Sequence, residues 1–209
     1  TAQVMFMARL SGDACWNGTF SGREMPEADT MTFRHRLATQ QDIPAIIDLM
    51  KLSLEENMKT LLSFEEIEAA KETMGVDQTL IDDGTYFVIE VDTPERKLVG
   101  CGGWGKRRTL FGGNHTKGRD DSLSDPSREA ARIRAMYTHP QWVRRGIGSL
   151  LIRLGEEAAR AAGFTRIALG STLAGESLYL AHGYAEVRRE TFRGENGADN
   201  LVIAMEKNL

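Results

Sequence analysis

The chain has 209 residues, of which 41% are hydrophobic and 27% are charged, and its formal net charge at pH 7 is −4. These values are typical of a water-soluble globular domain, without the basic excess of a nucleic-acid-binding protein or an apolar run long enough to span a bilayer. The two cysteines lie far apart and the four histidines are scattered. We therefore expect free thiols, a reducing cytoplasmic setting, no metal site, and neither a nucleic-acid nor a membrane partner.

The first thirty residues differ in composition from the rest of the chain. They contain many Gly, Asp, Asn and Ser residues and no sustained hydrophobic period, which is typical of loops. Their only apolar run, residues 4–7, is too short for a signal peptide. We expect residues 1–30 to be an N-terminal extension, mostly disordered, or the result of an over-long start, and residues 31–209 to form a single domain.

The domain is predicted to begin with a strand, residues 33–37, followed by a helix. Asp42 is predicted to cap this helix, and Pro44 lies in its first turn, where proline is favoured. The apolar stripe of the helix has the spacing that faces a core. Its members are Ile43, Ile46, Ile47, Met50 and Leu54.

A second helix and a β-hairpin are predicted to follow. Ser63 and Glu66 have the spacing of a capping box at the start of the helix. Residues 85–91 and 98–104 have the β-branched and aromatic content of two paired strands. Cys101 lies in the second strand, where we interpret it as a small buried residue rather than a nucleophile, because no base is placed beside it by the sequence.

Residues 105–128 have loop composition and are too long for an ordinary connection, which is typical of a functional lid. Lys106, Arg107 and Arg108 at its start are interpreted as a solvated basic edge. The alternative is that they recognise an anionic part of a substrate.

The most informative segment follows this loop. A β-rich run ends at Pro140, and Arg144 and Arg145 lead into the turn Gly146-x-Gly148 and an amphipathic helix. This order directs free backbone N–H groups at a positively polarised helix start toward one point, which is suited to bind phosphate. The apolar positions of the helix are Ile147, Leu150, Leu151, Leu154, Ala158 and Ala161.

Two common phosphate-binding turns do not fit this segment. A dinucleotide fingerprint requires a third glycine where Leu151 stands, and residues 112–117 lack the order of a Walker A loop. The glycines could also serve only to shape a loop between a strand and a helix.

The remaining residues add strand 166–170, a helix over 175–182 that carries Tyr179, strand 184–192 and strand 201–205. The predicted order of elements is β-α-α-β-β-β-α-β-α-β-β. This order favours a mixed α/β (α+β) fold, with helices flanking a central, mostly antiparallel twisted sheet.

Two segments resemble the motifs of the GNAT N-acetyltransferases. The turn at Gly146 resembles the pattern Gln/Arg-x-x-Gly-x-Gly/Ala of motif A, and the Tyr179 helix followed by Gly183-Tyr184 resembles the end of motif B. The resemblance covers the chain from about residue 33 to its end. The chain departs from the family at Val143, where motif A has Gln or Arg, and at Thr172, where the family often has Asn.

The resemblance implies the GNAT acyl-CoA N-acyltransferase fold, acetyl-CoA as co-substrate and Tyr179 as general acid. No base is indicated clearly; Glu129 is a weak candidate, and Glu90 and His139 are others, although each fits a surface or structural role better. The positions that match the cofactor-binding motifs are Met136, Tyr137, Thr138, Arg144, Arg145, Gly146, Ile147, Gly148, Ser149 and Thr172.

The expected function is transfer of an acetyl group from acetyl-CoA to a primary amine by direct attack in a ternary complex. The acceptor is expected to be a small-molecule or peptide amine, and GNAT sheets often pair into homodimers. The alternatives are a non-catalytic sensor or subunit that binds CoA through a GNAT-like domain and, more distantly, a nucleotide-binding domain.

Overall fold

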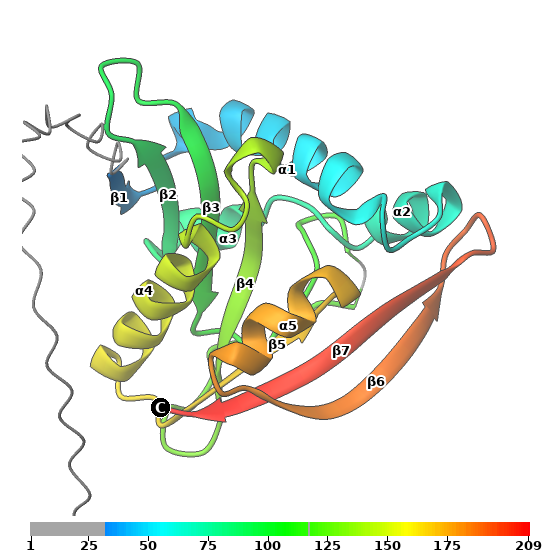
Figure 1. Ribbon diagram of the computed structural model, residues 1–209. Coiled ribbons are helices and arrows are strands. Elements are labelled where there is room, and N and C mark those ends of the chain that lie inside the picture. Colours follow the sequence, from blue (N-terminus) through cyan, green and yellow to red (C-terminus); the bar gives the residue numbers. More distant parts are fainter. Residues whose placement is uncertain (1–31, 117) are drawn as a thin grey trace, which may run out of the picture. The chain divides into compact units, whose positions relative to one another are not determined.

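The computed structural model describes residues 32–116 and 118–209, which are drawn in colour in Figure 1. The predicted N-terminal extension lies outside the described residues. The described part contains one sheet of seven strands in the order β1-β2-β3-β4-β5-β7-β6. The strands are β1 (Phe33–Leu37), β2 (Tyr86–Val91), β3 (Leu98–Gly105), β4 (Ala131–Thr138), β5 (Arg166–Ser171), β6 (Ala185–Arg193) and β7 (Asp199–Asn208).

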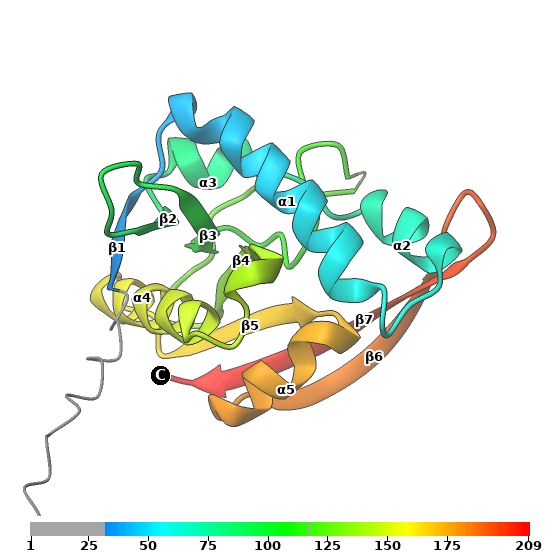
Figure 2. The same cartoon turned by 45° about the horizontal axis from the view of Figure 1, so that its top comes forward.

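Helices cover both faces of this sheet (Figure 2). One core cluster joins α1 and α3 to one face, and a second joins α4 and α5 to the other. This confirms the predicted mixed α/β architecture, and the predicted order of elements is also correct except that α3 was not expected. The helices are α1 (Ile43–Met58), α2 (Phe64–Lys71), α3 (Gln78–Asp82), α4 (Ile147–Ala161) and α5 (Leu173–Ala181).

The sheet opens between β4 and β5, its only parallel pair. These strands are paired at Ala131 and Arg132 alone, and every other neighbouring pair is antiparallel. Beyond these residues β4 carries a bulge. It is recognised by the φ of +50° at Ala135 and by the shift of the β3–β4 register at the same place. The Tyr86 hydroxyl donates to the Ala135 carbonyl at 2.6 Å. A bulge bends its strand, so the second half of β4 diverges from β5. The edge of β4 there faces a cleft instead of a neighbouring strand.

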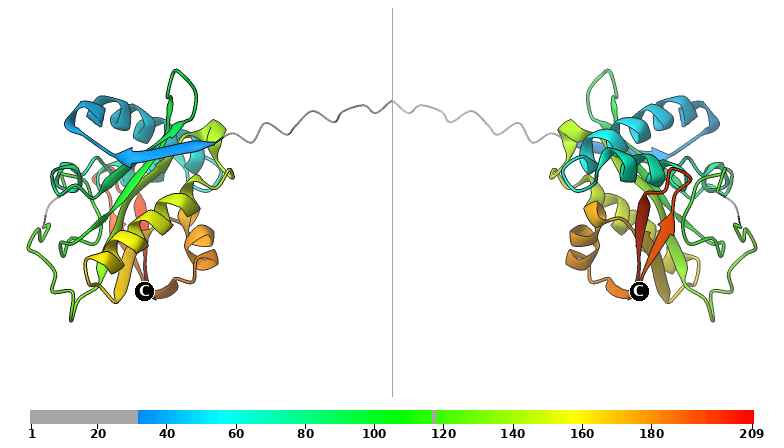
Figure 3. Two further views of the ribbon diagram at one scale, coloured as in Figure 1. Left: turned by 90° about the vertical axis from the view of Figure 1, so that its left-hand side faces the viewer. Right: turned by 90° about the vertical axis from the view of Figure 1, so that its right-hand side faces the viewer.

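Strands β6 and β7 form a long hairpin whose tip reaches α2 (Figure 3). The Glu195 N–H donates to the Glu72 carboxylate at 2.9 Å, and the Asn196 side-chain amide donates to the Glu65 carbonyl at 2.8 Å. The hairpin therefore joins the far end of the sheet to the helical layer beside the cleft. The observed β7 is longer at both ends than the predicted strand, which covered only residues 201–205.

The two predicted helix caps differ in outcome. Ser63 caps α2 as predicted: its hydroxyl accepts from the Glu66 N–H at 3.2 Å, and the Glu66 carboxylate accepts from the Ser63 N–H at 2.8 Å. Asp42 stands at the N-cap of α1, but its side chain makes no capping bond there. It instead accepts from the Thr39 N–H at 2.7 Å and pairs with Arg36 at 2.8 Å, because a short 3-10 turn precedes α1.

We expect a Ser63→Ala substitution to lower the free energy of unfolding by about 1 kcal/mol, because the first turn of α2 loses its side-chain acceptor. Urea unfolding measures this change, and Ser63→Asp, which keeps an acceptor, serves as the control. Equal losses for the two variants would show that the cap contributes nothing here.

Candidate active site

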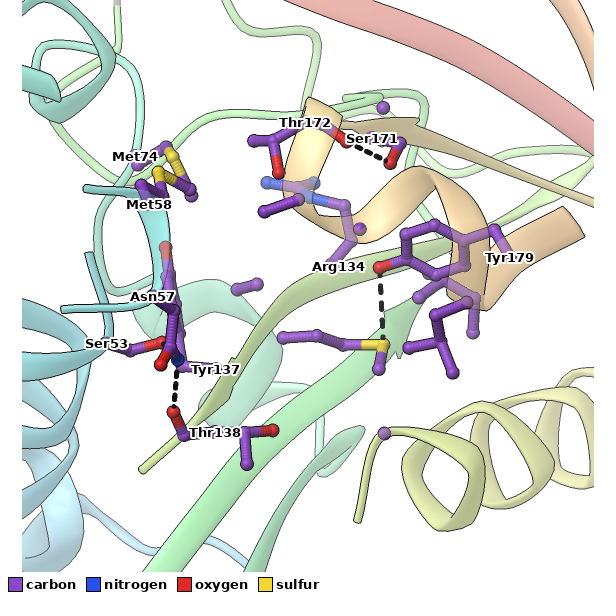
Figure 4. Close-up of a pocket in the computed structure, with 18 of the residues that line it drawn as sticks. Ser53, Asn57, Met58, Met74, Arg134, Tyr137, Thr138, Ser171, Thr172 and Tyr179 are labelled. Carbon is purple, nitrogen blue, oxygen red and sulfur yellow. Dashed lines mark hydrogen bonds between the residues drawn. The ribbon is translucent and has the colours of Figure 1, made fainter. Parts of the chain in front are cut away.

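A cavity of about 690 Å³ occupies the opening between β4 and β5 and extends toward α1 (Figure 4). Its walls come from α1, the α2–α3 connection, the long loop, the end of β4, the start of α4, α5 and β7. The structure brings together at this cavity nearly all of the site residues predicted from the sequence. Those that line it are Met136, Tyr137, Thr138, Arg144, Gly146, Ile147, Gly148, Ser149, Thr172 and Tyr179.

Arg145 is the predicted cofactor residue that does not line the cavity. Its guanidinium lies over the Trp142 ring, 4.8 Å from the ring centroid, in a cation–π contact. This contact places the Arg145 side chain on Trp142, in the turn before α4. The neighbouring Arg144, in contrast, lines the cavity.

The turn at the start of α4 has the predicted helix-start geometry. Gly146 has a φ of +85°, a conformation that favours glycine, and the first helical hydrogen bond runs from the Leu150 N–H to the Gly146 carbonyl. The N–H groups of residues 147–149 therefore have no carbonyl partner within the helix, as at any helix N-terminus. A Cβ on Gly148 would lie 2.7 Å from Leu178 Cδ2, so glycine lets α4 and α5 approach closely here without a shift of the Leu178 side chain.

The sequence did not indicate a second polar group beside this helix start. His182, which ends α5, has its Nε2 at 2.8 Å from the Ser149 hydroxyl, and both residues line the cavity. The contact joins the two helices that flank the cleft. The residues are 33 positions apart, so no local pattern relates them.

Tyr179 projects from α5 into the cavity and is 9% exposed. Its hydroxyl donates a weak hydrogen bond to Met136 Sδ at 3.6 Å, as Figure 4 shows, and its ring contacts Tyr184 edge-to-face at 5.8 Å. Burial raises the pKa of Tyr179 well above its usual range, because the phenolate would lose its hydration. The phenol is therefore protonated at neutral pH.

Helix α1 contributes a polar contact to β4 at the other side of the cavity. The Asn57 side-chain amide donates to the Thr138 carbonyl at 2.8 Å and to the Ser53 hydroxyl at 3.0 Å. Sequence reasoning did not identify these residues. Asn57 and Thr138 are 81 positions apart, and only the folded sheet brings them together.

Arg134 on β4 fixes the long loop against the cavity. Its guanidinium donates to the Thr109 carbonyl at 2.8 Å, to the Gly112 carbonyl at 2.6 Å and to the Asp77 carboxylate at 2.6 Å. Asp77 is 1% exposed and also accepts from Arg119 of the loop at 3.0 Å. The loop is thus held to β4 and to the segment before α3 by a buried ionic network.

The basic residues at the start of the loop each lie near a carboxylate. Lys106 and Arg107 approach Asp83, at 3.8 and 2.7 Å, and Arg108 pairs with Glu129 at 2.8 Å. None of the three lines the cavity. These ion pairs lie at the surface and connect the start of the long loop to Asp83 and Glu129.

None of the three base candidates lines the cavity. Glu129 pairs with Arg108, which lowers the pKa of that carboxyl, and it also accepts from the Asp125 N–H at 2.7 Å. Glu90 pairs with Arg36 at 2.7 Å. His139 caps a short 3-10 turn by accepting from the Gln141 N–H, and burial lowers its pKa. All three have structural partners away from the site.

The sequence model of the Acetyltransferase (GNAT) family matches residues 49–184, which is more than half of the chain. The chain belongs to the GNAT acetyltransferase family. The match runs from within α1 to the residue before β6, so it includes both motif segments but not the β7 part of the cavity wall. A comparison with curated proteins finds no significant match.

Solved structures share the fold of this GNAT chain. A GCN5-related N-acetyltransferase from Rhodopseudomonas palustris is 20% identical, with a TM-score of 0.61 over 86% of this chain and 98% of that chain. PaiA N-acetyltransferase from Thermoplasma acidophilum, solved in complex with coenzyme A, is 14% identical, with a TM-score of 0.53 over 86% and 100% of the two chains. YncA, a putative acetyltransferase from Salmonella typhimurium solved with acetyl-CoA, is 18% identical, with a TM-score of 0.54 over 85% and 94%.

Within residues 32–116 and 118–209, no group of His, Cys, Asp and Glu side chains has the arrangement of a metal site. No helix in the same part of the chain has both the length and the apolar content needed to cross a bilayer.

Cys101 of the GNAT domain is a buried core residue, as predicted. Its side chain is 0% exposed, and burial raises its pKa to about 12. We expect a disulfide reagent to leave Cys101 unmodified in the folded protein and to modify it after unfolding, because only the exposed thiolate reacts. A Cys15→Ser variant, whose single thiol is Cys101, makes the titration unambiguous. Rapid labelling of the folded variant would contradict the assignment.

Proposed function

We propose that this GNAT domain transfers an acetyl group from acetyl-CoA to a primary amine by direct attack in a ternary complex. The observation that carries the proposal is one continuous cavity that joins the start of α4 to Tyr179 and to α1. A diphosphate-binding corner, a proton donor and an acceptor wall therefore share one space. The reaction forms a bond between the amine nitrogen and the acetyl carbon and breaks the bond from that carbon to sulfur.

The start of α4 is suited to hold the diphosphate of CoA. The N–H groups of residues 147–149 and the positive end of the helix dipole favour an anion there, and Arg144 adds a charged donor to the same cavity. Gly146 and Gly148 leave room for a ligand to approach the backbone. At Met136, β4 is not paired with β5, so its main-chain groups there are suited to bind the pantetheine arm.

Tyr179 is the proposed general acid. Its hydroxyl lies beside Met136 at the end of the divergent strand, where the leaving sulfur is expected. The leaving sulfur takes the hydroxyl proton as the carbon–sulfur bond breaks, and the last proton lost by the amine nitrogen returns to Tyr179 through water, because burial makes a lasting phenolate unfavourable. The attacking amine must be neutral, and an alkylamine is mostly protonated at pH 7. We propose that water in the cavity removes this proton, since Glu129, Glu90 and His139 lie elsewhere.

The test is release of CoA thiol from acetyl-CoA in the presence of a panel of primary amines, together with calorimetric titration of CoA. Binding with amine-dependent thiol release supports the enzyme. Binding without release from any amine supports the alternative, a CoA-binding sensor. Absence of CoA binding overturns both.

A further inference from the structure

Part of the cavity is lined by apolar side chains, and we call this part the acceptor chamber. Its residues come from four separate segments, and those from α1 and β7 are almost fully buried. Met58 and Met74 pack together in one core cluster, and Figure 4 shows them on the opposite side of the cavity from Tyr179. Methionine adapts to apolar ligands of varied shape. The chamber is lined by Leu54, Met58, Met74, Leu110, Phe111 and Val202.

The β-sheet side of the chamber is closely packed. Phe111 contacts Phe192 edge-to-face, with ring centroids 5.4 Å apart. A Cβ added to Gly170 would lie 3.1 Å from Val202 Cγ1 and 3.3 Å from Phe111 Cβ. Phe111 and Val202 therefore rest directly on the β5 backbone, and they form a fixed apolar surface.

Arg134 holds the loop side of the chamber in place. The two carbonyls that its guanidinium binds belong to Thr109 and Gly112, which flank Leu110 and Phe111. Two neutral polar residues of the cavity wall, Asn200 and Thr73, are also held in place. The Asn200 side-chain amide donates to the Thr73 hydroxyl at 3.0 Å. The chamber therefore has a defined shape that does not depend on a bound acceptor.

The charge of the cavity restricts what it can accept. Among the described residues that line it, the side chains with a permanent charge are Arg134 and Arg144. The negative charge of Asp77 lies behind the wall, bound to Arg134 and Arg119. A second ammonium on an acceptor would meet apolar surface, neutral polar groups or positive charge, with no carboxylate among the described lining residues, and burying it without an ionic partner is unfavourable.

We propose, on the basis of the acetyltransferase function above, that the acceptor is a primary amine carried by an apolar body, such as an arylalkyl or branched alkyl amine, and not a polyamine. The apolar body fills the chamber between Met58, Met74 and Phe111. The amine points toward Tyr179 and the divergent part of β4.

Thiol release with 2-phenylethylamine and with spermidine tests this proposal at saturating acetyl-CoA. We expect kcat/KM for 2-phenylethylamine to exceed that for spermidine by roughly tenfold or more, which is the range that an apolar pocket supplies. Preference for spermidine would overturn the proposal and leave the acetyltransferase function standing. If neither amine reacts, calorimetry on the CoA-saturated protein decides. Binding of 2-phenylethylamine alone supports the chamber, and failure to bind it overturns the proposal.

A matched pair of variants at Met74 tests the location of the chamber. Met74 is half-buried at the cavity surface, so a polar side chain can be accommodated there. Met74→Glu adds a carboxylate, and Met74→Gln has nearly the same shape without the charge. For each variant, kcat/KM for spermidine is divided by kcat/KM for 2-phenylethylamine. We expect this ratio to be roughly fivefold higher for Met74→Glu than for Met74→Gln, which is what one partly exposed ion pair provides. Equal ratios would overturn the proposed location.

Discussion

A Tyr179→Phe variant is expected to bind acetyl-CoA with the affinity of the wild-type protein and to lose roughly 10²- to 10⁴-fold in kcat, the usual contribution of a positioned general acid. The ring remains, so its contact with Tyr184 and the packing of α5 are retained. Only the hydroxyl near Met136 is lost. The expected effect is therefore on turnover and not on stability.

Steady-state thiol release and calorimetric titration of acetyl-CoA measure the two quantities. Tyr184→Phe is the matched control, since Tyr184 is a buried neighbour that contacts Tyr179 but does not line the cavity. We expect the control to keep wild-type kcat. If Tyr179→Phe also kept wild-type kcat, the proton for the leaving thiolate would have to come from another group or from water.

An Asp77→Ala variant is expected to lose about 3–5 kcal/mol of unfolding free energy, because it leaves buried positive charge without its partner. Asp77 is 1% exposed and contacts both Arg134 and Arg119. The side chain of Arg134 is itself only 4% exposed, so water cannot replace the lost carboxylate. Such a loss is a large fraction of the stability of an ordinary domain.

Asp121→Ala is the control for this prediction. Asp121 also pairs with Arg119, at 2.9 Å, but its side chain is 48% exposed. We expect the control to lose less than about 1 kcal/mol, as exposed ion pairs do. Urea unfolding of the two variants measures the difference. Similar small losses for both would mean that the buried network contributes little to stability.

Several features that depend on neighbouring residues were predicted correctly from the sequence, although the Asp42 cap of α1 was not. The Ser63–Glu66 capping box and the Gly146 turn both have the expected geometry. The buried position of Cys101 was also predicted correctly. In each case the residues that determine the structure are close together in the chain, so spacing and residue type carry the information.

Several other features were not predicted from the sequence, for different reasons. Arg134 and Asp77 are 57 positions apart, and neither was singled out, because a buried ion pair has no signature in local sequence. Helix α3 has only 5 residues and no long apolar period to reveal it. The bulge at Ala135 requires a positive φ at a residue other than glycine, which composition does not indicate.

The candidate site shows the same division. The cofactor side could be predicted from two motifs, and the structure brings nearly all of those residues to one cavity. The acceptor side could not, because its wall combines α1, the α2–α3 connection, the long loop and β7. Glu129 was proposed as a base from its position before β4 alone, and its partner Arg108 lies 21 positions away in the loop.

The proposed function depends on binding of the CoA diphosphate at the start of α4. A crystal structure of the protein with CoA tests it most directly. We predict diphosphate oxygens within about 2.7–3.2 Å of the backbone nitrogens of Ile147, Gly148 and Ser149. A bound CoA whose diphosphate lies away from these nitrogens would contradict the account.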